Sequence, residues 1–325
     1  MNNNTQRVAI IGAGLAGLNA AITLREAGLQ ISLFERLEHT GGRLGNAEQV
    51  DTGAQYFTAR HPAFRQASRE WQAQGWVVEW LPQLYFHDQQ HGLRPSTDDT
   101  QRLVAVPGMC DLGHRLQEGL PLIHADIKHL QQTADGDWIL HAAEGGEHGP
   151  FSAVLIATPP DVATRLLAAA PQLQQDVARV RMRPCWSVAM QFHQPLPTLV
   201  DACFVRDGPL DWLARNSSKP QRQGSEAWVL QSTASWAEQH VHSSPEQVVA
   251  DLRQAMAEVM GLQLPASSSS QAHYWPQARP AEQMKWGALA ATQLGLYVCG
   301  DWCLGGRIEN AWLSGRQAAK ALLNK

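Results

Sequence analysis

Hydrophobic residues near the N-terminus form two short runs separated by a segment that favours a helix. Residues 7–11 read RVAII, a continuous apolar run typical of an inner strand of a parallel sheet. Residues 15–27 favour a helix, and Gly28 stands where glycine commonly ends one. Residues 30–34 form the second run, which ends at Glu35. The pattern predicts a strand–helix–strand unit at the start of the chain.

Apolar periodicity predicts elements along the rest of the chain as well. Helices are expected at residues 64–74, 107–118, 161–180 and 248–260, and a last helix should run through Leu322. Strands are expected at residues 122–130, 138–142, 154–156, 185–192, 202–205, 210–214, 227–233 and 295–299. Residues 76–86 resemble a strand pair, whereas residues 91–102 and 265–271 resemble polar loops. The later strands suggest an antiparallel sheet with flanking helices, inserted into the first unit.

Glycines lie in the predicted turn between the first strand and the first helix. Gly12, Gly14 and Gly17 form a GxGxxG pattern with a strand before it and a helix after it. Gly12 permits a tight turn, Gly14 lets a pyrophosphate approach the backbone, and Gly17 lets helix and strand pack closely. The helix start, including Ala16, offers amides and a positive dipole end to phosphates. Glu35 can accept hydrogen bonds from a ribose, so the segment predicts a dinucleotide-binding site.

Residues beyond this acid separate NAD from FAD as the dinucleotide. Arg36 follows at once, and Gly41, Gly42 and Arg43 come a few residues later. This glycine doublet with an arginine is not part of the minimal NAD pattern. It is similar to an extension found in FAD proteins of the glutathione-reductase-like fold, where Arg43 could pair with a phosphate. The sequence therefore favours FAD.

The segment DTGAQYFTAR at residues 51–60 is the next candidate. Ala54 follows a glycine, and the pair would let the backbone approach a flat ring closely. Gln55 and Tyr56 offer polar groups and an aromatic face, and Arg60 could meet an anionic substrate. We expect the segment to contact both cofactor and substrate.

Near the C-terminus, Cys299 and Cys303 bracket Gly300 and Asp301. One interpretation is a redox-active cysteine pair, which requires accessible thiols of low pKa. The other is a strand, a turn and a helix start that hold the cofactor, since FAD enzymes of the similar fold place such an aspartate near the ribityl and pyrophosphate groups. The helix start would aim amides at the flavin edge, where negative charge develops. The predicted contacts are Glu309, Asn310 and Ala311. The surrounding pattern favours this second interpretation.

Composition narrows the class of protein. The chain has 325 residues, 44% of them hydrophobic, and a formal net charge of −4, which suits two domains. It has no run of 18 apolar residues and no basic tract of five, so we expect neither a membrane nor a nucleic-acid partner. No metal-ligand cluster stands out. Five cysteines and no signal-peptide pattern predict a cytoplasmic protein.

Motifs over nearly the whole chain resemble those of renalases, particularly bacterial ones, within the monoamine-oxidase-like flavoproteins. They are IIGAGLAGLNAA, FERLEHTGGR, DTGAQYFTAR, PGM, GPFSAVLIATPP, PLDWLARN, ARP and YVCGDWCLGGRIENAWLSG. The resemblance implies an α/β fold, with a glutathione-reductase-like FAD-binding Rossmann domain and an inserted antiparallel-sheet substrate domain. The FAD domain would comprise residues 1–70, 103–170 and 287–325, and the substrate domain residues 71–102 and 171–286.

The resemblance also implies an activity. Non-covalently bound FAD would oxidise the 2- and 6-dihydro isomers of NAD(P)H to NAD(P)+ by hydride transfer to flavin N5, and molecular oxygen would yield hydrogen peroxide. Such chemistry needs positioning rather than a catalytic side chain. The backbone near Ile127 would contact adenine. The implied substrate residues are Tyr56, Phe57, Thr58, Ala59, Arg60, Ser96, Thr97, Trp186 and Trp286.

Two alternatives stay open. An amine oxidase of the same fold typically uses a lysine bridged by water to the flavin, together with an aromatic cage. Lys285 lies too near the Gly300–Asp301 motif to match that pattern. The other alternative is a binding protein that keeps the fold without flavin chemistry, and the intact set of dinucleotide motifs speaks against it.

Overall fold

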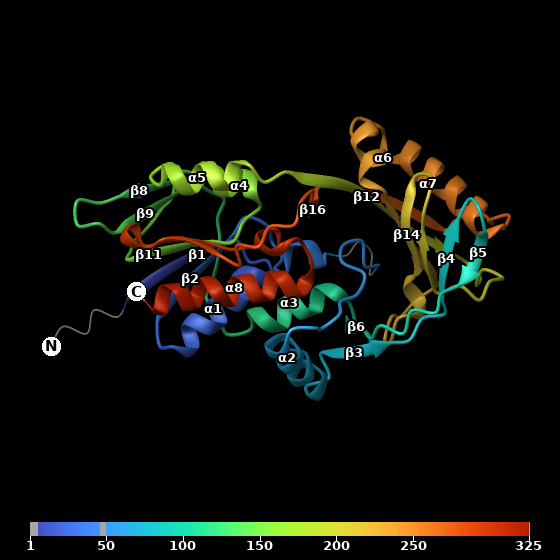
Figure 1. The fold of residues 1–325 in the computed structure, drawn as a ribbon, viewed down its shortest axis with the longest axis horizontal. Helices are drawn as coiled ribbons and strands as arrows, with labels where there is room; N and C mark the ends of the chain where they lie inside the picture. Colours follow the sequence, from blue (N-terminus) through green and yellow to red (C-terminus); the bar gives the residue numbers. More distant parts are fainter. Residues whose placement is uncertain (1–5, 46–49, 325) are drawn as a thin grey trace.

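The first unit of the fold is built on a mostly parallel sheet. The computed structural model describes residues 6–45 and 50–324, and Figure 1 shows this sheet at one end of the molecule. The strand order is β17-β18-β11-β1-β2-β7, and neighbours pair in parallel except β17 with β18. The strands are β1 (Arg7–Ile11), β2 (Gln30–Glu35), β7 (Leu122–His124), β11 (Ala153–Ile156), β17 (Leu289–Ala291) and β18 (Leu296–Val298). The α/β fold expected from the sequence is confirmed.

Layers cover both faces of this sheet because its inner strands are apolar on both sides. Val8 and Ile10 of β1 contribute to one core, and Ala9 and Ile11 to the other. The first face is covered by α1 (Leu15–Glu26), α2 (Pro62–Ala73), α3 (Met109–Gln117) and α8 (Ile308–Leu323). The second is covered by α4 (Pro160–Leu166), α5 (Pro171–Ala178) and a small antiparallel sheet of β8 (Ile127–Gln132), β9 (Trp138–Ala142) and β10 (Glu147–Phe151).

A second sheet lies at the other end of the molecule (Figure 1). Its strand order is β16-β12-β15-β14-β13-β4-β5. The strands are β4 (Leu84–Asp88), β5 (Gly92–Pro95), β12 (Met182–Phe192), β13 (Ala202–Val205), β14 (Leu210–Arg215), β15 (Glu226–Ser232) and β16 (Ser269–Pro280). The helices α6 (Ala234–Gln239) and α7 (Pro245–Met260) pack on one face of this sheet.

The sequence had suggested an antiparallel sheet, but one pair of its strands is parallel. β13 pairs in parallel with β4, which lies far earlier in the chain, and no hairpin joins the two strands. Residues 76–86 do contain two strands, but these do not pair with each other. β3 (Val77–Trp80) pairs instead with β6 (Arg102–Ala105). Short 3₁₀ helices complete the fold: η1 (Gly42–Leu44), η2 (Asn216–Ser218), η3 (Thr292–Leu294) and η4 (Asp301–Leu304).

Three further predictions need correction. Residues 122–130 are two strands, because Ala125 donates its amide to the carbonyl of Glu35 and the chain then turns to pair with β9. β16 begins inside the predicted loop 265–271, and β5 lies inside the predicted loop 91–102. Both are edge strands with one neighbour each, so neither needs the alternating apolar pattern of an inner strand.

The second unit also begins later than the predicted boundary at residue 171. Leu173 and Val177 of α5 belong to the core of the first unit, where α5 packs against α4. β12, the first strand of the chain after α5, begins at Met182. Among the described residues, no helix is long and apolar enough to cross a membrane.

Candidate active site

The turn between β1 and α1 requires glycine at two positions and is open at a third. Gly12 has φ 102°, and a Cβ there would lie 2.8 Å from the carbonyl oxygen of Ala157. A Cβ on Gly17 would collide with the carbonyl oxygen of Gly12. Gly14 has no atom within 4 Å of a Cβ position, and no side chain caps the start of α1. The first amides of α1, including that of Ala16, are therefore open to an anionic ligand.

Glu35 is held beside this turn. Its carboxylate accepts a hydrogen bond from the amide of Ala13 at 2.8 Å and another from the amide of Leu37 at 3.0 Å. Arg36 is exposed beyond it. Ala125 reaches the carbonyl of Glu35, which brings the start of β8, with the buried Ile127, to the end of β2. The predicted acid and the predicted adenine segment therefore lie together.

The glycine doublet lies against the same turn. The amide of Gly41 donates to the carbonyl of Ala13 at 2.8 Å, and Gly41 also bridges to Gly14. Gly41 and Gly42 have φ angles of 93° and 55°, which glycine adopts without strain. The loop thus brings Gly42 next to Gly14, as a shared phosphate site requires.

Arg43 has a different partner from the predicted phosphate. Its guanidinium forms an ion pair with Asp301, with Nη1 3.1 Å from Oδ2, and donates to the carbonyl of Ala278 at 2.9 Å. Because Asp301 comes from the C-terminal motif, this pair joins the two predicted halves of the cofactor site. Arg43 therefore orients Asp301 and ties it to β16.

The segment that follows β18 is braced by its own side chains. The amide of Gly300 donates to Ser314 Oγ at 3.0 Å. Glu309 accepts hydrogen bonds from the amides of Arg60 and His61 at 2.7 and 2.6 Å. Asn310 donates to the carbonyl of Gly306 at 3.0 Å. The side chains of Glu309 and Asn310 thus hold loops in place, and what remains for a ligand at these positions is the backbone.

The start of α8 offers fewer amides than the sequence predicted. Its first turn has no side-chain cap, so the amides of Glu309 and Asn310 stay available. The amide of Ala311, however, donates to the carbonyl of Arg307 at 3.0 Å and so forms the first helical hydrogen bond. The amide of Ala311 is therefore used within the helix and is not free to donate to the flavin.

Cys299 and Cys303 do not form a redox pair. Both are free thiols buried in the core. Burial raises the pKa of both thiols well above the ordinary value. A reactive cysteine needs the opposite, an accessible thiol with a lowered pKa. Of the two interpretations of this segment, the structure therefore favours the one in which it holds the cofactor.

The segment 51–60 is fixed by a buried charge network that the sequence did not predict. Asp51 accepts hydrogen bonds from Lys219 Nζ at 2.9 Å and from Arg222 at 2.7 Å, and all three side chains are buried. Lys219 also donates to Gln55 Oε1 at 3.2 Å. The amide of Ala54 donates to the carbonyl of Arg43 at 2.9 Å. The segment therefore has one fixed course, against the glycine doublet on one side and the second unit on the other.

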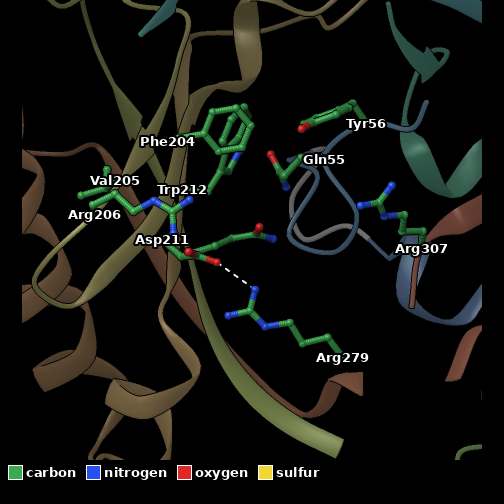
Figure 2. Close-up of a pocket in the computed structure, with 10 residues that line it drawn as sticks. Gln55, Tyr56, Phe204, Val205, Arg206, Asp211, Trp212, Arg279 and Arg307 are labelled. Atoms are coloured by element: carbon green, nitrogen blue, oxygen red, sulfur yellow. Dashed lines mark hydrogen bonds and ion pairs between the residues drawn. The ribbon is translucent and has the colours of Figure 1, made fainter. Parts of the chain in front are cut away.

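A cavity of about 610 Å³ opens between the two units (Figure 2). Tyr56 and Gln55 face it from the first unit, and Trp212 from β14. The ring centroids of Tyr56 and Trp212 are 5.5 Å apart. Its described lining consists of Gln55, Tyr56, Phe204, Val205, Arg206, Asp211, Trp212, Gln231, Arg279 and Arg307.

Charge in this cavity is mainly positive. Its lining includes Arg206, Arg279 and Arg307 against Asp211, which pairs with Arg279 at 3.0 Å. Burial raises the pKa of the Tyr56 phenol above its ordinary value, although nearby guanidinium groups act in the opposite direction. The cavity thus combines an aromatic wall with an excess of arginine.

Comparison with known proteins places the chain in a family. The sequence profile described as flavin containing amine oxidoreductase matches residues 98–323, which is most of the chain. The chain belongs to the flavin-containing amine oxidoreductase family. A profile described as an NAD(P)-binding Rossmann-like domain matches residues 10–71. The protein is thus a flavin-dependent oxidoreductase by family.

Individual relatives of this flavoprotein are distant or matched only in part. It is 51% identical over 43 residues to a 4,4'-diapolycopene oxygenase of Methylomonas sp, covering 13% of this chain and 9% of the relative. It is 39% identical over 69 residues to an L-amino-acid oxidase of Crotalus adamanteus, covering 21% and 13%. Cyclohexylamine oxidase from Brevibacterium oxydans IH-35A has the same fold, with a TM-score of 0.77, 12% identity and coverage of 98% and 99%.

The cofactor of this flavoprotein is FAD, because the family carries a flavin and the Rossmann unit binds a dinucleotide. Three features of the fold fit it: the glycine turn, the uncapped starts of α1 and α8, and the Arg43–Asp301 pair that joins them. Thr40 Oγ1, next to the glycine doublet, is buried without a hydrogen-bond partner among the described residues. The FAD expected from the sequence is confirmed.

Of the predicted substrate residues in segment 51–60, one lines the cavity and four do not. Tyr56 lines the cavity, whereas Phe57 is buried in the core against Phe64 and Trp71. Thr58 and Ala59 are half-buried, and Arg60 is exposed, with its amide bound to Glu309. None of these four lies among the described cavity residues. The alternation of side chains along the segment explains why Tyr56 and its neighbour Phe57 point apart.

Trp186 is buried in a core, and Trp286 is half-buried against another. Trp186 packs under α6, donates its indole N–H to the carbonyl of His240 at 3.0 Å, and so faces away from the cavity. Trp286 packs against the core that contains α4 and α5. Ser96 continues the β5 edge by donating its amide to Leu84, and Thr97 is exposed. None of these four residues lines the described cavity, and their assignment to the substrate stays a prediction.

The cavity residues that the sequence did not single out are Phe204, Val205, Arg206, Asp211, Trp212, Gln231, Arg279 and Arg307. Four of them stood within motifs that carried the resemblance: Asp211 and Trp212 in PLDWLARN, Arg279 in ARP, and Arg307 in the C-terminal motif. These residues were therefore present in the quoted motifs. Their place in one cavity could not be predicted, because the three elements that carry them meet only in the folded chain.

Proposed function

We propose that this flavoprotein oxidises the 2- and 6-dihydro isomers of NAD(P)H to NAD(P)+, with molecular oxygen as electron acceptor. The observation that carries the proposal is the positive cavity, in which Arg206, Arg279 and Arg307 face an aromatic wall. A dinucleotide offers a flat ring and phosphates, and guanidinium groups bind phosphate well. The motif resemblance described above supports the choice of these isomers.

The reaction asks little of the side chains. Bound FAD would supply the hydride acceptor, and its reoxidation by molecular oxygen with uptake of one proton would give hydrogen peroxide. The substrate becomes an aromatic cation without losing a proton to the protein, so no general base is required. Tyr56 and Trp212, with centroids 5.5 Å apart, would orient the ring, and the arginines would hold the phosphates.

Amine oxidation is the second candidate. The family match favours it, and so do the paired rings of Tyr56 and Trp212 with the carboxylate of Asp211, which together could receive a cationic amine. Two observations weigh against it. Lys219 is buried against Asp51, and Lys285 is exposed, and neither lines the cavity. A net positive cavity also repels a cation.

Anaerobic stopped-flow spectroscopy separates the two candidates. The oxidised holoenzyme is mixed with 2-dihydroNAD(P), 6-dihydroNAD(P), ordinary NADH, or a panel of primary and polyamines, and flavin absorbance is followed. We expect rapid bleaching with the 2- or 6-dihydro isomers and little with amines. Admission of air should then regenerate the oxidised spectrum and produce one peroxide per substrate. Rapid bleaching by an amine, with none by the dihydronicotinamides, would reject the proposal.

A further inference from the structure

The backbone of Arg307 is strained in a way that a glycine would relieve. Its φ of 132° and ψ of 156° lie in a region that is essentially reserved for glycine. Such a conformation is unfavourable for a residue with a side chain. The other described residues with positive φ and a side chain, Asp207 and Gln221, have φ near 60°, in a region that short polar residues tolerate better. Arg307 is thus the unusual case.

The sequence around it makes the choice of arginine more telling. Gly305 and Gly306 precede it, with φ angles of 92° and 78°. The chain therefore uses glycine at two successive positions of this turn and then places a large charged residue at the third. Strain that persists where a simpler residue is available points to a role of the side chain.

The side chain of Arg307 lies in the cavity and lacks a charge partner. It is exposed and lines the cavity with Tyr56, as Figure 2 shows. Arg279 is neutralised by Asp211 and Arg43 by Asp301, whereas Arg307 forms no ion pair with any residue in 6–45 or 50–324. Its charge thus faces the cavity uncompensated. It stands at the start of α8, whose dipole adds to the positive potential.

We propose that Arg307 is the residue that selects a phosphorylated substrate, by pairing its guanidinium with the phosphate next to the nicotinamide ribose. The strained turn is retained because it directs this guanidinium into the cavity. The identity of the ligand rests on the proposed function, since the nicotinamide nucleotide is taken from it. The expectation of an anion rests on the cavity alone. Arg307 is accordingly a specificity residue and takes no part in the transfer of the hydride.

A pair of ligands that differ by one phosphate isolates the contact. Nicotinamide mononucleotide and nicotinamide riboside are titrated into the oxidised holoenzyme by calorimetry, for the wild type and for Arg307→Ala. We expect Arg307→Ala to raise the Kd of the mononucleotide about tenfold, as one charge-assisted pair implies, and to leave the riboside within about twofold. Arg307→Lys should restore part of the difference, because it keeps the charge without the fork.

Two variants control for charge and for strain. Arg69→Ala removes an exposed arginine of α2, outside the cavity, and should leave both dissociation constants unchanged. Arg307→Gly should weaken the mononucleotide as Arg307→Ala does, but should raise the Tm of the holoenzyme because the turn relaxes. A merely structural role for Arg307 predicts the reverse, a lower Tm and no loss specific to the phosphate.

The outcomes separate this inference from the proposed function. If the wild type binds the mononucleotide no better than the riboside, or if Arg307→Ala keeps the difference, the role of Arg307 is rejected, whatever reduces the flavin. If the difference depends on Arg307 while only amines bleach the flavin, the phosphate contact stands and the proposed oxidation falls. If dihydronicotinamides bleach the flavin and Arg307→Ala binds the mononucleotide as the wild type does, the proposed oxidation stands and the role of Arg307 is rejected.

Discussion

Asp51 carries a full charge in the core and is balanced by two cations. Lys219 and Arg222 lie 2.9 and 2.7 Å from its Oδ2, and the amide of Met109 donates to its Oδ1 at 2.9 Å. Removing one member of a buried ion pair leaves the rest uncompensated, at a cost of about 3–5 kcal/mol. We expect Asp51→Asn to cost about that much, because two cations lose their partner. Lys219→Met should cost less, since Arg222 still neutralises Asp51.

Urea unfolding of the holoproteins measures both variants. Equal losses, or a larger loss for Lys219→Met, would contradict this account of the network. Lys219→Met should also remove the hydrogen bond that Lys219 donates to Gln55 Oε1 at 3.2 Å, which loosens this cavity residue and so should slow flavin reduction more than it weakens substrate binding. The limiting reduction rate and the Kd, each obtained from the dependence of the reduction rate on substrate concentration, report the two effects separately from stability.

The same network predicts a pH dependence with a defined sign. Burial acts to raise the pKa of Asp51, but the charges of Lys219 and Arg222 outweigh it and the pKa is lowered overall. A carboxyl with a lower pKa in the folded state stabilises the fold above its unfolded pKa of about 3.9. That stability is lost as the pH falls below about 4 toward the folded pKa. The free energy of unfolding should therefore decline below pH 4 in the wild type, and less steeply in Asp51→Asn.

At the level of elements, α1 and α8 of the first unit approach each other closely. Gly315 of α8 faces the carbonyl of Ala16, and a Cβ there would collide with it. Asn19 of α1 reaches across to the carbonyl of Trp312 at 2.7 Å. Because Ala16 lies in the first turn of α1, whose amides are open to an anionic ligand, we expect packing and FAD binding to be coupled through this contact.

Gly315→Ala should therefore weaken both the packing of α1 against α8 and the binding of FAD. Overpacking of this kind typically costs about 1–3 kcal/mol, which Tm and urea unfolding would register. We also expect a higher Kd for FAD, measured by titration of the apoprotein, because the first turn of α1 is displaced. Gly146→Ala is the control. No atom lies closer than 3.7 Å to its Cβ position, and its φ is outside the left-handed region that favours glycine. A variant of Gly315 that is destabilised but binds FAD normally would separate the two effects.

Local signals explain which elements the sequence predicted. The unit of β1, α1 and β2 depends on an apolar run, a glycine turn and an acid, all within a short segment, so the sequence alone is enough. β13, at Ala202–Val205, was likewise predicted with its full bounds. The edge strands β5 and β16 were missed because one of their sides lacks a neighbour and the apolar pattern is weak. The partners of β3 and β4 depend on residues far away in the chain.

The site also consists of a part with local sequence signals and a part without them. Its cofactor half was predictable because glycine turns and an acid have a fixed spacing. In the substrate half the sequence singled out Tyr56 but not Trp212, Arg279 or Arg307, because these come from separate segments that meet only after the second sheet docks. Trp186 shows the limit of motif reasoning, since it stands on the right sheet but on the face covered by α6. Strand register decides that face, and no local motif encodes it.

In the whole molecule, segment 51–56 connects the two units. Lys219 and Arg222 hold Asp51 from the second unit. Gln231 of β15 donates to the carbonyl of Gly53 at 2.8 Å, and Trp275 of β16 donates to that of Thr52 at 3.1 Å. The cavity opens directly beside this junction, with walls from both units (Figure 2). A ligand in the cavity must therefore touch both.

Hydrogen exchange on the holoenzyme, with and without NAD+, tests this arrangement. A ligand that binds only the folded state adds about 2.7 kcal/mol at a hundredfold excess over its Kd, and slows opening wherever it makes contacts. We expect slower exchange at residues 202–215 and at the start of α8 together, because both line the cavity. Adenosine at the same concentration, which lacks phosphates, should protect neither segment to that extent. Protection confined to one unit would mean that NAD+ binds outside the cavity, and the positive charge there would need another ligand.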